Sequence, residues 1–309
     1  MAREVWTCFQ SYQRGGEKIK ELTVISGKGG TGKTSITAAF ASLADNAVFA
    51  DCDVDAADLY LILKPKIKKT TKFHGLKIAS IDKSLCIDCK KCYDYCHFNA
   101  IDENINLIKE SCEGCSVCEF VCPVHAISMV DRNSGFAYIS ETRFGPMSHA
   151  ILKTSEEASG KLVTVVRNNA KHLVEEKHKD LIIIDGPPGI GCPVISSITG
   201  VDLVLIVTEP TLSAIHDLER ILGVAQHFHI PAVVCINKSS INADNTSKIE
   251  QYCKKNNILI VGKLPYDTTI TQAMINEQSI IEFSDGVLSH TIRNMWNKIL
   301  EVLKQNGQR

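Results

Sequence analysis

The 309-residue sequence has no excess of charge of either sign, since 34 lysines and arginines are balanced by 35 aspartates and glutamates. A formal net charge of −1 predicts neither a nucleic-acid partner nor an acidic membrane partner. Long hydrophobic runs are also missing, and stretches such as LVLIV at 203–207 are too short to span a bilayer. The first twenty residues lack the apolar segment of a signal peptide. We therefore expect a cytoplasmic protein that binds neither nucleic acid nor a membrane.

Cysteine, by contrast, is plentiful and concentrated in one segment. Eight of the 13 cysteines lie within residues 86–122. In a reducing cytoplasm, regularly spaced cysteines indicate metal ligands before disulfides. Scattered cysteines are usually small buried side chains, and we expect this of the other five: Cys8, Cys52, Cys192, Cys235 and Cys253.

The cysteine segment contains the pattern C-x2-C-x2-C-x3-C-x3-A-I twice, at 86–101 and at 112–127. In such a run three thiolates bind one [4Fe–4S] cluster, and the fourth cysteine reaches the other cluster. One cluster is therefore assigned to Cys86, Cys89, Cys92 and Cys122. The second is assigned to Cys112, Cys115, Cys118 and Cys96. Structural zinc is the alternative, but zinc usually takes two separated CxxC pairs and does not explain the repeat.

Along its whole length this segment resembles the bacterial-type two-cluster ferredoxins. The second copy has Pro123 after its last cysteine, where the first copy has His97. Proline donates nothing to a metal, so its absence need not cost a ligand. We expect His97 to be an exposed or packed histidine; tuning of the cluster or proton transfer is the alternative.

The remainder of the chain has the pattern of an α/β protein. Apolar runs at 21–26, 46–53, 179–189, 201–210, 230–238 and 258–267 alternate with helical stretches. They predict a mostly parallel P-loop sheet with helices on both faces, closed by an amphipathic helix at 289–305. Residues 66–143 have little helical periodicity and short strand-like pieces at 75–82, 104–109 and 136–140, which indicates an inserted 2[4Fe–4S] ferredoxin-like domain. The expected organisation is an N-terminal extension (1–20), an α/β domain (21–65 and 144–309) and this insertion (66–143).

A phosphate-binding loop is predicted at 27–34, where GKGGTGKT fits G-x4-G-K-[ST] between a predicted strand and a predicted helix. Its backbone N–H groups can bind phosphates. Lys33 would reach the β- and γ-phosphates and the Thr34 hydroxyl would bind Mg²⁺. The run LIIID, which ends at Asp185, is similar to a Walker B strand. The expected ATP contacts of the loop are Gly29, Gly30, Thr31, Gly32, Lys33, Thr34 and Ser35.

The loop KGGTGKT resembles the deviant phosphate loop of the MinD/ParA ATPases, a group that includes the nitrogenase iron protein. This resemblance implies that Lys28 crosses a dimer interface to the partner's nucleotide, which would make dimerisation a catalytic event. The segment ADCDVDAADL (50–59) resembles switch I, with Asp53 implied to activate the attacking water. DGPPGIG (185–191) resembles switch II. The implied catalytic residues are Lys28, Lys33, Asp53 and Asp185, and the implied magnesium site consists of Thr34, Asp51 and Asp185.

The resemblance also implies an adenine pocket. Asn237 and Lys238 follow a predicted strand and resemble the adenine-side pair, with Asn237 as the base contact. The region from Pro265 to Asp267 would complete the pocket. Cys192 lies in DGPPGIGCPVISSITG (185–200), and it is expected to be a small packed residue, with an additional sulfur near the interface as the alternative.

From about residue 21 to its end, the chain resembles MinD-superfamily ATPases that contain an inserted ferredoxin domain. The implied cofactors are ATP, Mg²⁺ and two [4Fe–4S] clusters. The implied assembly is a homodimer or a heterodimer with a paralogue, acting on a redox or apo-metalloprotein partner. Electron transfer is the leading hypothesis, because eight cysteines complete two clusters within one chain. A cluster carrier or maturation ATPase is the alternative, and a partitioning or positioning ATPase is a third possibility.

Overall fold

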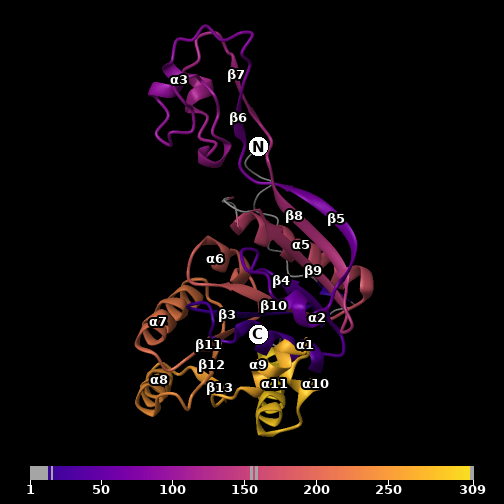
Figure 1. Cartoon of the computed structure of the whole chain (residues 1–309). Helices are drawn as coiled ribbons and strands as arrows, with labels where there is room; N and C mark the ends of the chain where they lie inside the picture. Colours follow the sequence, from indigo (N-terminus) through magenta and orange to yellow (C-terminus); the bar gives the residue numbers. More distant parts are fainter. Residues whose placement is uncertain (1–12, 15–16, 154–155, 157–158, 307–309) are drawn as a thin grey trace.

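The computed structural model describes residues 13–14, 17–153, 156 and 159–306. Within these residues, nine strands form one sheet in the order β13-β12-β11-β3-β10-β4-β9-β8-β5 (Figure 1). The strands from β13 to β9 run parallel, whereas β8 and β5 are antiparallel to their neighbours. The nine strands are β3 (Lys20–Ser26), β4 (Ala47–Asp51), β5 (Lys66–His74), β8 (Asn133–Glu141), β9 (Pro146–Leu152), β10 (Leu181–Pro188), β11 (Leu203–Thr208), β12 (Ala232–Ile236) and β13 (Leu259–Lys263).

The parallel strands are covered on both faces. Every residue of β4 and β11 is buried, as continuous apolar runs in a parallel sheet require. Successive side chains of a strand point to opposite faces, so Ile182 and Ile184 pack in one core and Ile183 packs in the other. The six apolar runs expected to be strands all lie in this parallel part. The predicted α/β fold with a mostly parallel sheet is therefore confirmed.

Two sets of helices form the outer layers. Helices α5 to α8 pack on the face of Ile182, and α1, α2 and α9 to α11 pack on the face of Ile183. In the second layer the rings of Phe40 and Trp296 lie 4.9 Å apart and join α1 to α11, the expected closing helix. No described helix is long and apolar enough to cross a membrane. The helices are α1 (Lys33–Leu43), α2 (Leu59–Leu63), α5 (Ser159–Lys177), α6 (Cys192–Ile198), α7 (Leu212–His227), α8 (Ala243–Lys255), α9 (Thr269–Ile275), α10 (Ile280–Phe283) and α11 (Val287–Asn306).

The predicted insertion at 66–143 begins and ends with strands that extend the main sheet. β8 pairs with β9, and β5 pairs with β8 at the edge. All residues of β5 except Phe73 are exposed, and its lysines are typical of an edge strand that avoids pairing with another chain. The residues that lie outside the main sheet in this segment are therefore 75–132, a shorter stretch than expected.

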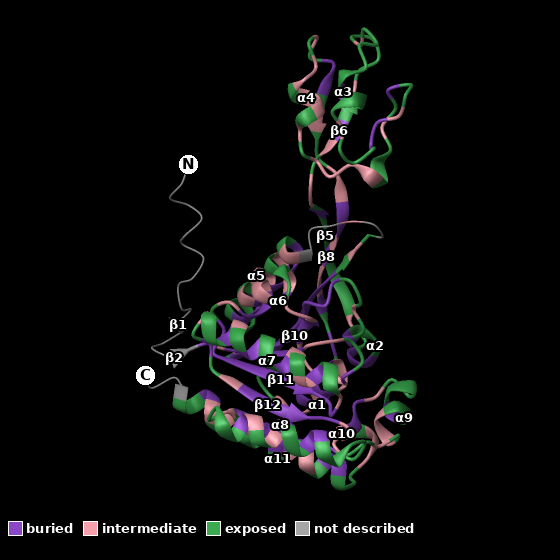
Figure 2. Ribbon diagram, turned by 90° about the vertical axis from the view of Figure 1, so that its left-hand side faces the viewer, coloured by how far each residue is buried: buried purple, intermediate pink, exposed green. Residues whose placement is uncertain are grey.

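Residues 75–132, called here the cysteine unit, stand away from the sheet and are joined to it through β5 and β8 (Figures 1 and 2). Strands β6 (Ile78–Ile81) and β7 (Ile127–Val130) form an antiparallel pair. Two short helices, α3 (Lys91–Asp94) and α4 (Val117–Phe120), carry the central part of each cysteine pattern. The strand-like piece at 104–109 forms no strand and contributes only a bridge between Leu107 and Ile101.

The two copies of the cysteine pattern have matching backbones. α3 and α4 occupy equivalent positions in the copies. Residues at three pairs of equivalent positions have positive φ: Asp88 and Gly114, Lys90 and Ser116, Asn99 and His125. The backbone N–H of Ala100 donates to Sγ of Cys96, and the N–H of Ala126 donates in the same way to Sγ of Cys122. The sequence repeat is thus also a structural repeat.

Candidate functional site

The predicted phosphate loop connects the end of β3 to the start of α1. Gly30 and Gly32 have positive φ values of 79° and 90°, which glycine adopts without strain. A Cβ atom on Gly32 would lie 2.3 Å from Nδ2 of Asn237. Glycine is therefore required at position 32 by both the backbone and its surroundings. The loop leads into the N-terminus of α1, which favours anions through its N–H groups and dipole.

Lys33 and Thr34 meet the carboxylate that ends the Walker B run. Nζ of Lys33 lies 2.9 Å from Oδ1 of Asp185, and Oγ1 of Thr34 donates to Oδ2 at 2.8 Å. Nζ of Lys33 also lies 3.4 Å from Oδ2 of Asp53. Burial would lower the pKa of Lys33, but the charges of Asp185 and Asp53 raise it. The lysine is therefore charged, and four of the predicted residues lie together at one edge of the sheet.

Asp51 and Asp53 are both buried beside this lysine. Burial raises the pKa of Asp51 well above its usual value, and the nearby charge of Asp185 adds to this effect. Burial also raises the pKa of Asp53. The carboxyl oxygens of Asp51 accept hydrogen bonds from the N–H groups of Asp53 and Leu59, so Asp51 fixes the segment between β4 and α2 that was predicted to be switch I.

The acidic groups are suited to a hydrated magnesium ion. Among the described residues, no three histidine, cysteine or acidic side chains converge on one point that would hold a metal ion. Magnesium in phosphate sites keeps several waters and takes one or two protein ligands together with phosphate oxygens. Thr34 and Asp185, joined by a hydrogen bond, match that requirement. Asp51, the third residue of the predicted magnesium site, accepts hydrogen bonds from the backbone N–H groups of Asp53 and Leu59.

A cleft of about 440 Å³ runs along the phosphate loop. It is lined by the seven predicted loop residues and by Asp53. The predicted adenine-side residues Asn237, Lys238, Pro265 and Asp267 line the same cleft. Sequence reasoning gave no role to Ile270, Thr271 and Met274 of α9, which line the same cleft. Their short helix carries no sequence motif, and their place beside the cleft is known only from the folded structure. Asp58 also lines the cleft.

Asn237 and Lys238 donate side-chain hydrogen bonds to the phosphate loop. Nδ2 of Asn237 donates to the carbonyl oxygen of Thr31 at 2.8 Å, and Nζ of Lys238 donates to that of Gly30 at 2.8 Å. Both side chains also line the cleft. The predicted adenine-side pair therefore contacts the loop itself in this structure.

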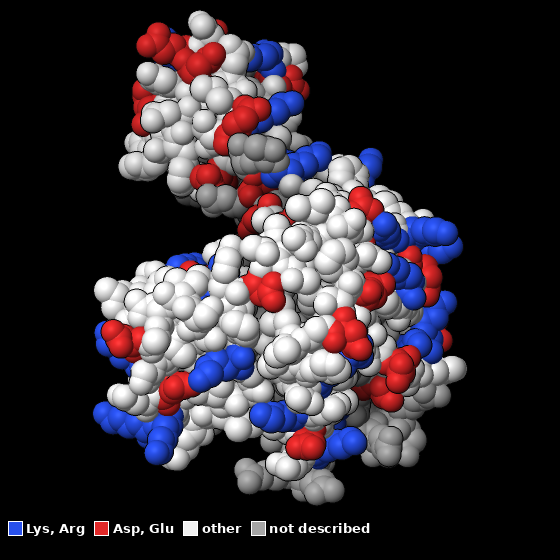
Figure 3. Space-filling view, turned by 60° about the horizontal axis from the view of Figure 1, so that its bottom comes forward, with Lys and Arg blue, Asp and Glu red and all other residues white. Residues whose placement is uncertain are grey.

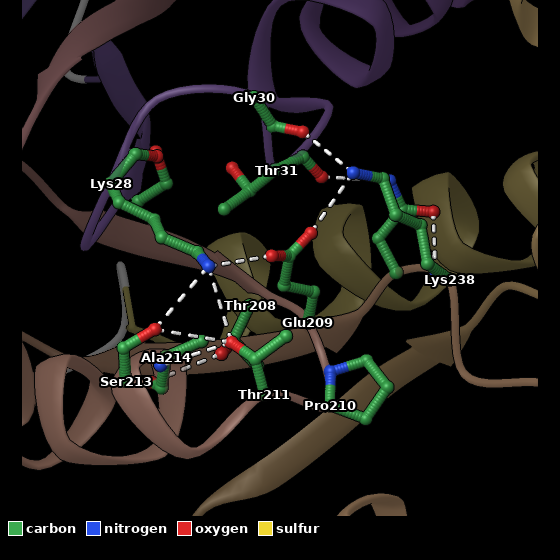
Figure 4. Close-up of polar contacts among 12 residues, drawn as sticks. Lys28, Gly30, Thr31, Thr208, Glu209, Pro210, Thr211, Ser213, Ala214 and Lys238 are labelled. Atoms are coloured by element: carbon green, nitrogen blue, oxygen red, sulfur yellow. Dashed lines mark hydrogen bonds and ion pairs between the residues drawn. The ribbon is translucent and has the colours of Figure 1, made fainter. Parts of the chain in front are cut away.

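Lys28 lies at the loop but not among the residues that line the cleft in the described part of the chain. Its Nζ is 2.7 Å from Oε1 of Glu209, which follows β11 (Figure 4). The other oxygen of Glu209 is 2.9 Å from Nζ of Lys238. Glu209 was not expected at the site, and no motif in the sequence identifies it.

The eight patterned cysteines line two separate cavities in the cysteine unit. One cavity is lined by Cys86, Cys89, Cys92 and Cys122, together with apolar side chains such as Ile105 and Ile127. The other is lined by Cys96, Cys112, Cys115 and Cys118, with neighbours such as Ile101 and Met129. In each cavity, therefore, three cysteines come from one copy of the pattern and the fourth comes from the other copy.

The two cavities fit [4Fe–4S] clusters in their chemistry. Each has four thiols as its sulfur donors and apolar side chains on its walls, which is the donor set of such clusters. Each thiolate of a cluster binds a different iron atom, so the sulfurs surround the group and need not converge on one point.

The remaining predictions have mixed outcomes. Cys52, Cys235 and Cys253 are buried as expected. Cys192 is exposed at the start of α6, so its expected packing is wrong; the helix buries Val194, Ser197 and Ile198 instead. His97 is exposed. Within the predicted extension 1–20, β1 (Gln13–Arg14) pairs with β2 (Glu17–Lys18), whereas Cys8 lies outside the described residues.

Charges on the surface are mixed. On the face seen in Figure 3, basic and acidic side chains are interspersed over both the sheet domain and the cysteine unit. This face has no continuous basic area of the kind that nucleic-acid-binding proteins use.

Comparison with known proteins relates the chain to nucleotide-binding proteins. Residues 22–280 match the CobQ/CobB/MinD/ParA nucleotide binding domain. An uncharacterized protein of Methanocaldococcus jannaschii is 36% identical over 290 residues, which cover 92% of this chain and 98% of that protein. The pyruvate synthase subunit PorD of Methanothermobacter marburgensis is 41% identical over 49 residues, or 16% of this chain and 60% of that protein.

Solved structures show the same fold. The cell division ATPase MinD of Pyrococcus furiosus superposes with a TM-score of 0.57 at 16% identity, covering 92% of this chain and 99% of that one. The septum site-determining protein MinD of Pyrococcus horikoshii, complexed with Mg-ADP, has a TM-score of 0.57 at 14% identity, with coverages of 93% and 98%.

Proposed function

The chain belongs to the CobQ/CobB/MinD/ParA nucleotide-binding family, and from this premise we propose that it is an ATP-hydrolysing iron–sulfur protein that works as a dimer. Nucleotide-driven switching of the dimer controls electron transfer to a partner protein. The observation that carries this proposal is the presence, in one chain, of a complete phosphate-loop cleft and two cavities with four cysteines each.

The residues of the cleft account for the hydrolytic half of the proposal. Lys33 would bind the β- and γ-phosphates, and Thr34 and Asp185 would hold a magnesium ion that neutralises phosphate charge. Asp53 accepts the proton of the attacking water, and its raised pKa suits a general base. Lys28 supplies a positive charge to the nucleotide of the second subunit.

The cysteine unit accounts for the redox half. When bound, the two clusters supply one-electron reduction of a partner. The cysteines hold each cluster with four sulfur donors from one chain, and the N–H groups of Ala100 and Ala126 stabilise the thiolates of Cys96 and Cys122. The short match to PorD lends support to a ferredoxin-like segment.

Two connections support coupling between the cleft and the cysteine unit. Switch I runs directly into α2, and only Lys64 and Pro65 separate α2 from β5, which leads to the cysteine unit. On the other side of the unit, Nε of Arg132 lies 2.5 Å from Oε1 of Glu156 in the sheet domain, and Nη1 of the same arginine donates to the carbonyl oxygens of Lys109 and Cys112. A movement of switch I would therefore be transmitted along the chain to the cysteines.

The alternative function is a cluster carrier or maturation ATPase. One observation favours it: each cavity has one exposed cysteine, Cys89 in the first and Cys115 in the second. An exposed ligand is accessible to the thiols of a receiving protein. The complete set of four cysteines per cavity favours electron transfer.

Anaerobic mixing separates the two functions. The reduced protein is incubated with ATP and either oxidised benzyl viologen or an apo-ferredoxin that has empty [4Fe–4S] sites. For electron transfer we expect ATP-dependent reduction of the dye, with about eight iron atoms retained per chain. Iron that appears in the apo-ferredoxin would instead identify a carrier. Dye reduction at the same rate with and without ATP would contradict nucleotide control.

A further inference from the structure

The ammonium group of Lys28 is fully engaged within its own chain (Figure 4). Its Nζ lies 2.7 Å from Oε1 of Glu209, and the hydroxyl oxygens of Thr211 and Ser213 lie 3.2 and 3.4 Å from the same nitrogen. An ammonium group has three donor hydrogens, so the turn between β11 and α7 satisfies all of them. Lys28 can reach a second nucleotide only after leaving this turn.

Glu209 keeps a second partner when Lys28 leaves. Its Oε2 lies 2.9 Å from Nζ of Lys238, which also donates to the carbonyl oxygen of Gly30. Burial would raise the pKa of Glu209, but the hydrogen bonds and charges of Lys28 and Lys238 outweigh it and lower the pKa. The carboxylate is therefore ionised at neutral pH. After Lys28 leaves, it remains paired with Lys238 and is not left as an isolated buried charge.

The exposures and the other contacts of the three side chains together indicate which ion pair can open. The side chain of Glu209 is 11% exposed, and those of Lys28 and Lys238 are 35% and 28% exposed. A lysine at the surface can exchange one anion for another at modest cost. The additional partner of Lys238 is a carbonyl oxygen of the phosphate loop at 2.8 Å, whereas the additional partners of Lys28 are two hydroxyl groups at 3.2 and 3.4 Å. The pair with Lys28 is therefore the one that is free to exchange.

We propose that Glu209 holds Lys28 in its own chain while no second subunit is present, and that dimer closure has to break this ion pair. The inference rests on the proposed function, in which Lys28 crosses to the nucleotide of the second subunit. There the nucleotide phosphates replace the Glu209 carboxylate as the counter-anion. Glu209 is thus a positioning residue that acts through Lys28 and opposes premature closure.

The test is the dimer dissociation constant of Glu209→Gln with the non-hydrolysable analogue AMPPNP, measured by analytical ultracentrifugation. Glutamine keeps the size of the side chain but removes its charge and replaces one acceptor oxygen with an amide donor. We expect the dimer to be about threefold to tenfold tighter than in the unaltered protein, as for loss of a partly exposed ion pair in the monomer. A purely structural role for Glu209 would give a weaker dimer.

The matched control is Glu250→Gln. Glu250 forms an ion pair of 2.9 Å with Lys263, and both side chains are exposed. This variant removes the same charge from the same type of pair, and its dimer constant should equal that of the unaltered protein.

A second measurement examines the ion pair directly and does not need the dimer. Primary amines of the nucleotide-free protein are labelled briefly with acetic anhydride, and the modification of Lys28 is quantified by mass spectrometry. We expect Lys28 to react faster in Glu209→Gln than in the unaltered protein. Equal labelling rates would overturn the proposal even if the variant dimerised poorly.

The outcomes distinguish this inference from the function on which it rests. If the unaltered protein dimerises with AMPPNP but Glu209→Gln is no tighter, Glu209 does not oppose closure and the proposed function stands. If the unaltered protein does not dimerise with AMPPNP at all, the proposed function fails and the inference fails with it.

Discussion

Replacing Lys28 with alanine is expected to lower ATP turnover by about 10³-fold, because a positive charge supplied to the transferring phosphate contributes at least that factor in comparable enzymes. The clusters should assemble normally, since Lys28 lies between β3 and α1 in the sheet domain and the described partners of its ammonium group all lie at 209–213. The measurement is ATP turnover of the anaerobic protein, together with its visible absorbance.

Lys263→Ala is the matched control for this variant. Lys263 is an exposed lysine that pairs with Glu250, outside the residues that line the cleft. Its loss should leave turnover within about twofold, as for an ordinary surface ion pair. Normal turnover in Lys28→Ala would show that no lysine has to cross between subunits.

Replacing two cysteines is expected to remove one cluster if both line the same cavity, and both clusters if each lines a different cavity. The unaltered protein should hold about eight iron atoms per chain, and Cys96→Ser alone should reduce this to about four. Adding Cys115→Ser should cause no further loss, since both cysteines line the same cavity. Adding Cys89→Ser instead should leave about zero iron atoms, because Cys89 lines the other cavity.

Iron analysis of these double variants also tests the crossed arrangement against the simple one. If each copy of the pattern bound its own cluster with its own four cysteines, the two double variants would exchange their results. Cys192→Ser serves as the control, since this exposed cysteine lies outside both cavities, and it should retain all of the iron. Stoichiometric zinc in place of iron would contradict the cluster assignment altogether.

The sequence predicted the features that depend on local pattern. β4, β10 and β11 are continuous apolar runs, and a run of this kind has one favourable environment, a strand covered on both faces. The phosphate loop was predictable because Gly32, whose positive φ favours glycine, is one of the two glycines that define the motif. The cysteine sets were predictable because the pattern is repeated, so each copy supports the interpretation of the other.

The features that were missed depend on contacts between distant parts of the chain. β5 is rich in lysine and almost entirely exposed, so nothing in its composition identifies a strand of the main sheet. Glu209 meets Lys28 only because β11 lies beside β3 in the sheet. Strand order cannot be read from a single sequence, and a carboxylate without a motif is usually an ordinary surface residue.

The central claim is that the nucleotide controls the redox properties of the clusters, and the most direct test is their reduction potential in two nucleotide states. The potentials are determined anaerobically by titration monitored by electron paramagnetic resonance, once with ADP and once with AMPPNP. We predict that AMPPNP makes at least one cluster more reducing by about 59 mV or more, which corresponds to a tenfold change for one electron. Identical potentials in the two states, with nucleotide demonstrably bound, would contradict the account.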